Sequence, residues 1–174
     1  MGYGVTVDSS GNAYVTGSTG TAMSPSPAQA YVLKVTPGGG TAYLVGFGTG
    51  GLQTIGFGIA LDSQNNAYVT GMTNDPHFPQ ITSGAAQPTY GGGVSDAFVV
   101  ELDAAGQLPP IYGTYIGGLG SGLLPERGAG IGVDLEGDAY VAGTTQCINF
   151  PTTNAIATAN RPVMRTAQHA RPDR

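Results

Sequence analysis

The chain has 174 residues, of which 40% are hydrophobic and only 10% are charged, and its formal net charge is −5 at pH 7. Up to residue 160 the positively charged side chains are Lys34 and Arg127 alone, too few to neutralise a nucleic-acid backbone or to hold an anionic membrane surface. We therefore expect no nucleic-acid partner and, because no apolar run reaches about 20 residues, no membrane insertion.

A short segment is repeated three times and indicates how the chain is built. Residues 7–17 read VDSSGNAYVTG, residues 61–71 read LDSQNNAYVTG, and residues 133–143 read VDLEGDAYVAG. Each copy has an apolar strand end, a turn that begins with Asp, and a second strand rich in Tyr and Val that ends at Gly. This pattern predicts a β-hairpin used as a repeating unit.

Further strands extend each hairpin into a larger unit. We expect four strands in the first unit, four in the second and two in the third, at residues 4–7, 13–17, 30–35 and 41–47, then 58–61, 67–71, 97–102 and 111–116, then 130–133 and 139–143. The corresponding segments are a first repeat at 1–57, a second at 58–128, a partial third at 129–160 and a divergent Arg-rich tail at 161–174.

The expected fold is all-β, an incomplete β-propeller of about two and a half four-stranded antiparallel blades. Strands such as YVLKV and AFVVEL are apolar on both sides, as in a blade that is covered by neighbours on both faces. Propellers have about four to eight blades, so we expect further repeats of the same or another chain to complete the ring. Alone, the chain would leave two apolar blade faces open and fold poorly.

Four sequence blocks occur in the order found in one known family. They are the DSSGNAYVTG type of hairpin, DAFVVELDAAG, TYIGG, and a Phe-Pro block that occurs at 71–79 and 143–151. Over residues 3–160 the chain resembles the SBBP family, the bacterial β-propeller repeat. The first unit lacks the Phe-Pro block, and His77 and Asn149 stand where the family commonly has Asp.

The resemblance implies a non-catalytic repeat module of an exported or cell-surface bacterial protein, acting in binding or display. The alternatives are a propeller domain of a polysaccharide-directed enzyme and a purely structural spacer. The implied location is extracellular or at the cell surface, although the first residues of the chain lack the basic and apolar regions of a signal peptide.

One loop is the expected binding element. Gly71 and Ala97 are 26 residues apart, whereas the corresponding Gly17 and Ala30 are 13 apart, and insertions in repeat proteins collect on one face. We expect a carbohydrate or protein ligand to contact this loop, residues 72–95. The candidate contact residues are Asp75, His77, Phe78 and Tyr90.

The three Asp-led turns place oxygen atoms at alternate positions, which allows a calcium interpretation. A structural turn explains them better, because Asp accepts hydrogen bonds from amides further along the turn. Gly11 and Gly137 suit a left-handed position, for which we assign Asn66 in the second copy. Within the calcium interpretation, the third turn is the best candidate, because it has three carboxylates that could hold a weakly bound ion; they are Asp134, Glu136 and Asp138.

No group of residues predicts catalysis. Cys147 has no cationic neighbour in sequence and is expected to be buried or half-buried. The GFGTGG segment at 46–51 lacks the helix that a dinucleotide site needs. The carboxylates in and beside the third strand of the second unit are expected at solvated or rim positions and not as a catalytic pair; they are Asp96, Glu101 and Asp103. The repeated tyrosines are expected to pack between blades or, alternatively, to stack on carbohydrate; they are Tyr14, Tyr68 and Tyr140.

Overall fold

The computed structural model describes residues 1–19, 28–119, 124–147, 149–151 and the backbone of 164–168. All regular elements in these ranges are β-strands. They are β1 (Gly2–Val7), β2 (Ala13–Ser18), β3 (Ala30–Val35), β4 (Thr41–Phe47), β5 (Thr54–Leu61), β6 (Ala67–Thr73), β7 (Asp96–Leu102), β8 (Tyr112–Ile116), β9 (Arg127–Val133), β10 (Ala139–Thr144) and β11 (Met164–Gln168).

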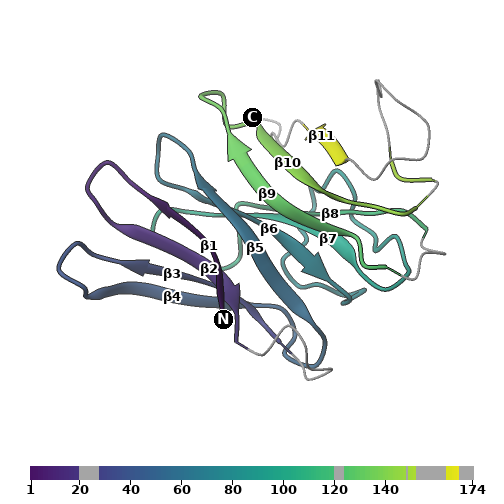
Figure 1. Ribbon diagram of the computed structural model, residues 1–174, viewed down its shortest axis with the longest axis horizontal. Coiled ribbons are helices and arrows are strands. Elements are labelled where there is room, and N and C mark those ends of the chain that lie inside the picture. The colour runs from purple at the N-terminus through teal and green to yellow at the C-terminus, as the bar shows by residue number, and fades with distance from the viewer. Residues whose placement is uncertain (20–27, 120–123, 148, 152–163, 169–174) are drawn as a thin grey trace.

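The described strands form three antiparallel sheets. The first has the order β1-β2-β3-β4, the second β5-β6-β7-β8, and the third β9-β10-β11. The second sheet lies between the other two, because β5 contacts both β1 and β9 (Figure 1). The predicted all-β fold with an incomplete set of propeller blades is therefore confirmed.

The first strand of the second and third sheets begins earlier than the sequence indicates. β5 begins at Thr54 and β9 at Arg127, whereas the expected strands begin at 58 and 130. The additional residues precede a β-bulge, where simple strand patterns fail. Residues 164–168, which fall in the expected divergent tail, pair as β11 with β10, and the rest of that tail lies outside the described residues.

Each hairpin contains the same bulge, and a glycine makes it possible. The register shifts between Gly2 and Gly4 opposite β2, and between Gly56 and Gly58 opposite β6. At the bulge in the second sheet, a Cβ on Gly71 would overlap the carbonyl of Ile55. Gly17 and Gly143 occupy the same position against the carbonyls of Met1 and Arg127, which explains why every copy of the repeat ends in glycine.

The Asp-led turns are held by their own hydrogen bonds. Asp8 Oδ1 accepts from the backbone N–H groups of Ser10 and Asn12, both at 2.9 Å. The left-handed residue of the second turn is Asn65, with φ of 64°, so our assignment of that position to Asn66 is wrong. Asn66 matches Asn12 instead, because its backbone N–H donates to the leading Asp62 carboxylate at 2.8 Å.

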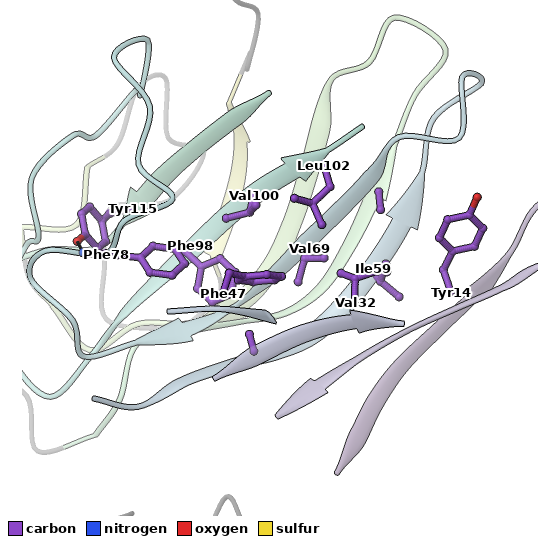
Figure 2. Close-up of a cluster of buried hydrophobic side chains, with 12 residues drawn as sticks. Tyr14, Val32, Phe47, Ile59, Val69, Phe78, Phe98, Val100, Leu102 and Tyr115 are labelled. Carbon is purple, nitrogen blue, oxygen red and sulfur yellow. Dashed lines mark hydrogen bonds between the residues drawn. The ribbon is translucent and has the colours of Figure 1, made fainter. Parts of the chain in front are cut away.

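The main core lies between the first and second sheets. Val32 and Phe47 of the first sheet face Val69 and Phe98 of the second (Figure 2), and the rings of Phe47 and Phe98 meet edge to face at 6.1 Å. A smaller cluster joins the second and third sheets, and its buried members are Ala97, Val99, Ile116 and Val141. The second sheet thus packs on both faces.

Burial follows from this arrangement and corrects one expectation. Asp96 and Glu101 are buried, whereas we expected them at solvated or rim positions. They are buried because β7 lies in the sheet that is covered on both sides. Tyr14 and Tyr68 are buried between sheets as predicted, whereas Tyr140 is 48% exposed. Tyr140 lies on the face of the third sheet that no other described sheet covers.

Replacing the bulge glycine tests this account of the repeat. We expect Gly71→Ala to lower the free energy of unfolding by about 2 kcal/mol or more, because the new methyl group must displace the Ile55 backbone. Urea unfolding of the full chain measures the change. Gly38→Ala is the matched control, since a Cβ at Gly38 meets no atom within 4 Å; equal effects of the two substitutions would contradict the account.

Candidate functional site

The contacts between neighbouring sheets repeat residue by residue. The hydroxyl of Thr70 donates to the Phe98 carbonyl at 2.8 Å, and that of Thr16 donates to the Tyr31 carbonyl at 2.9 Å. Each threonine also faces a glycine of the next sheet. A Cβ on Gly128 would overlap the Thr70 hydroxyl oxygen, and one on Gly56 would overlap that of Thr16.

Glycines also let the first strands of adjacent sheets approach closely. A Cβ on Gly4 would lie 2.9 Å from the Phe57 carbonyl oxygen, and a Cβ on Gly58 would lie 3.0 Å from the Cα of Gly130. Side chains larger than hydrogen at these positions would push the sheets apart. The repeated glycines and threonines therefore form a sheet-to-sheet interface with a fixed register.

The bulge residues of the first two sheets touch one another beside this interface. The rings of Tyr3 and Phe57 lie 5.2 Å apart. The guanidinium of Arg127, in the third sheet, lies 5.6 Å from the Phe57 ring centroid, within the range of a cation–π contact. These contacts link all three sheets along their first strands.

The outer face of the first sheet has no covering sheet among the described residues. Val5, Val7 and Leu44 on this face are 67%, 65% and 65% exposed. In the second sheet the residue equivalent to Val5 is Ile59, since Val5 pairs with Val15 and Ile59 pairs with Val69. Ile59 is buried against the first sheet, so the exposed apolar face is the type of surface that an additional blade covers.

The opposite end of the array presents the complementary face. In the third sheet Tyr140 and Ala142 occupy the positions of Tyr68 and Thr70, and both are exposed. The two outer faces of the described sheets thus correspond to the two faces that meet between neighbouring sheets, although Ala142 stands where the interface has a threonine.

The long loop at 72–95 lies along the edge of β8. The backbone N–H of Thr82 donates to the Gly113 carbonyl at 3.1 Å, and that of Tyr115 donates to the Gln87 carbonyl at 3.2 Å. The loop therefore forms hydrogen bonds with backbone groups of β8 that would otherwise be unpaired at the edge of the sheet. Unpaired edge strands can pair with strands of other chains, and the loop prevents this along part of β8.

The structure brings three of the four predicted contact residues together around Tyr115, which the sequence analysis did not single out. The Tyr115 hydroxyl donates to the Asp75 carbonyl at 2.8 Å and accepts from the Phe78 backbone N–H at 2.9 Å. The Tyr90 ring packs edge to face on Tyr115, with centroids 5.7 Å apart. His77 is exposed and its backbone N–H donates to Asp75 Oδ1 at 2.8 Å.

Their surroundings differ from those we expected of ligand contacts. Asp75 and Phe78 are buried, because the loop folds back over the second sheet. Burial, and then the nearby Asp96 carboxylate, raise the pKa of Tyr90 to about 12. Of the four candidates, only the side chain of His77 is on the exposed surface, and Tyr90 is half-buried.

The Asp-led turns use their carboxylates internally. The side-chain amide of Asn12 donates to Asp8 and is the main reason that the pKa of Asp8 is lowered. The backbone N–H of Asp138 donates to Asp134 at 2.8 Å and likewise lowers the pKa of Asp134. No group of three or more His, Cys, Asp or Glu side chains in the described ranges is placed to hold a metal ion.

Four-stranded antiparallel meanders that pack face to face, with equivalent loops on equivalent strands, define blades of a β-propeller. Within this class, residues 2–21 and 42–79 match the SBBP beta-propeller repeat. The resemblance predicted from the sequence blocks is therefore confirmed over these residues. A comparison with curated proteins gives no match. Within the described residues, no helix is long and apolar enough to cross a membrane.

A double-mutant cycle tests the contact between threonine and glycine. We expect Gly128→Ala to destabilise the chain by about 1–3 kcal/mol, because its methyl group meets the Thr70 hydroxyl. In the Thr70→Ala background that oxygen is gone, so the same substitution should be less damaging, with a coupling of about 1 kcal/mol. Urea unfolding of the four proteins measures it. If the two substitutions change the free energy of unfolding additively, the second and third sheets do not meet at these residues.

Proposed function

We propose that the chain is a non-catalytic propeller module of an exported or cell-surface bacterial protein, where it acts in binding or display. Its outer faces join further repeats of the same or another chain. The single observation that carries this proposal is the exposed apolar face formed by Val5, Val7 and Leu44, whose counterpart in the second sheet is buried by a neighbouring blade.

The ligand-binding part of the proposal concerns the loop at 72–95. Its backbone is fixed on β8 through Thr82 and Gln87, and Phe78 anchors it in the core. A loop held in this way can present His77 and the neighbouring exposed residues with little loss of conformational entropy on binding. A carbohydrate or a protein is the ligand class that we propose for it.

The chemistry of the buried acids and the thiol favours binding over catalysis. Asp96 and Glu101 lie inside the second sheet, whereas a carboxylate pair that cleaves glycosidic bonds must reach its substrate. Burial, followed by the effect of Glu126, raises the pKa of the Cys147 thiol to about 11. At neutral pH the thiol is therefore protonated and a poor nucleophile.

Self-association of the full chain tests the open face. We expect the weight-average mass in sedimentation to rise with concentration, as the exposed face of one copy receives the third sheet of another. Val5→Asp should suppress this rise, because it places a charge in the apolar contact. Leu135→Asp is the control, since Leu135 is a highly exposed residue of an Asp-led turn.

Two results would contradict the proposal. One is a chain that stays monomeric at all concentrations and unfolds cooperatively, with Val5→Asp behaving like the unaltered protein. The other is a gene whose flanking sequence encodes neither further repeats nor an export signal.

A further inference from the structure

Two carboxyl groups are buried together where the second and third sheets meet. Asp96 is the first residue of β7 and is 0% exposed, and Glu126 directly precedes β9 and is 2% exposed. Their neighbours connect the sheets directly. The Ser95 hydroxyl donates to the Glu126 carbonyl at 3.0 Å, and the Glu126 backbone N–H donates to the Ser95 carbonyl at 3.3 Å.

The two carboxyls differ in how well they are hydrogen-bonded. Both oxygens of Glu126 have partners, since Oε2 accepts from the Gly118 backbone N–H at 2.8 Å and Oε1 is hydrogen-bonded to the Thr145 hydroxyl. Asp96 Oδ2 accepts from the Gly91 backbone N–H at 2.6 Å, but its Oδ1 has no hydrogen-bond partner. A buried carboxylate oxygen without a partner is costly when the group is ionised.

The groups packed around Asp96 add no positive charge. Tyr90 comes from the loop, Tyr115 from β8, and Cys147 from the segment after β10. Burial is the main reason that the pKa of each is raised, and the negative charge of Asp96 adds to the increase. Asp75 also faces Tyr115. A Cβ on Gly117 would overlap the Asp96 carboxyl group, so the carboxyl is tightly enclosed.

We propose that the Asp96–Glu126 pair makes the joint between the second and third blades sensitive to pH. The joint is tight while Asp96 carries a proton, and it loosens when Asp96 ionises beside Glu126. The pair lies outside the open blade faces and the exposed part of the loop. Ionisation of Asp96 therefore changes the contact between the second and third sheets and not the proposed binding surfaces.

The direction of the effect follows from linkage. Burial raises the pKa of Asp96 to about 7, while the backbone N–H groups of Gly91 and Gly92 oppose the increase and Glu126 adds to it. A carboxyl that binds its proton more tightly in the folded state stabilises the fold at low pH. This contribution is lost as the pH rises from about 4 to about 7. Asp8 and Asp134 have lowered pKa values and lose their contribution only in more acid solution.

Urea unfolding of the full chain from about pH 5 to about pH 8 tests the proposal. We expect the folding equilibrium constant to fall about tenfold or more between pH 5 and pH 7. Asp96→Asn should remove most of this fall, because the amide keeps an oxygen acceptor for Gly91 and cannot ionise. Glu101→Gln is the matched control in the same strand, since burial also raises the pKa of Glu101; it should retain most of the fall.

Two further measurements on the unaltered protein show whether the pH effect arises at this joint, and they do not require that Asp96→Asn folds. Cys147 lies beside the joint, because its backbone N–H donates to the Thr145 hydroxyl oxygen at 3.1 Å. The alkylation rate of Cys147, divided by the rate for the urea-unfolded chain at the same pH, should rise with pH in the unaltered protein. The carbon resonance of the Asp96 carboxyl should titrate with a midpoint near 7. A stability profile that is flat or rises with pH, or a midpoint near 4, would overturn the proposal.

Discussion

The close approach of neighbouring first strands is the constraint on which the rest of the structure depends. Blades can pack face to face only where their backbones come near each other, and glycine at positions 4 and 58 leaves the room for it. The threonine of each hairpin then fits against a glycine of the next sheet, as Thr16 does at Gly56. The same few residue types therefore set both the bulge within a sheet and the spacing between sheets.

This constraint explains which parts of the array are stable by themselves. The second sheet has a neighbour on each face, and all described residues of β7 and β8 are buried. The first sheet leaves Val5 and Val7, the equivalents of Ile59 and Leu61, exposed, and Tyr140 is exposed on the third. A module of this kind gains stability from each further blade, and this is the physical reason for our proposal that further repeats join the array.

The sequence predicted the hairpins and the packing of Tyr14 and Tyr68 because repetition reveals local structure directly. It could not predict the burial of Phe78 and Asp75, since the loop that carries them has no periodic pattern and folds back through contacts with Tyr115. The burial of Asp96 was missed for a similar reason. A charged residue at a strand end is usually solvated, and only the three-dimensional structure shows that a second blade covers it.

Hydrogen exchange of backbone amides, resolved by residue, tests the central claim most directly. If each sheet is stabilised by the copies beside it, amides of β6 and β7 should be the most strongly protected. Paired amides of β1 and β2, whose sheet has one covered face, should exchange at lower free energies of opening. Equal protection of the paired amides in the first and second sheets would contradict the account, because it would mean that each blade is stable without its neighbours.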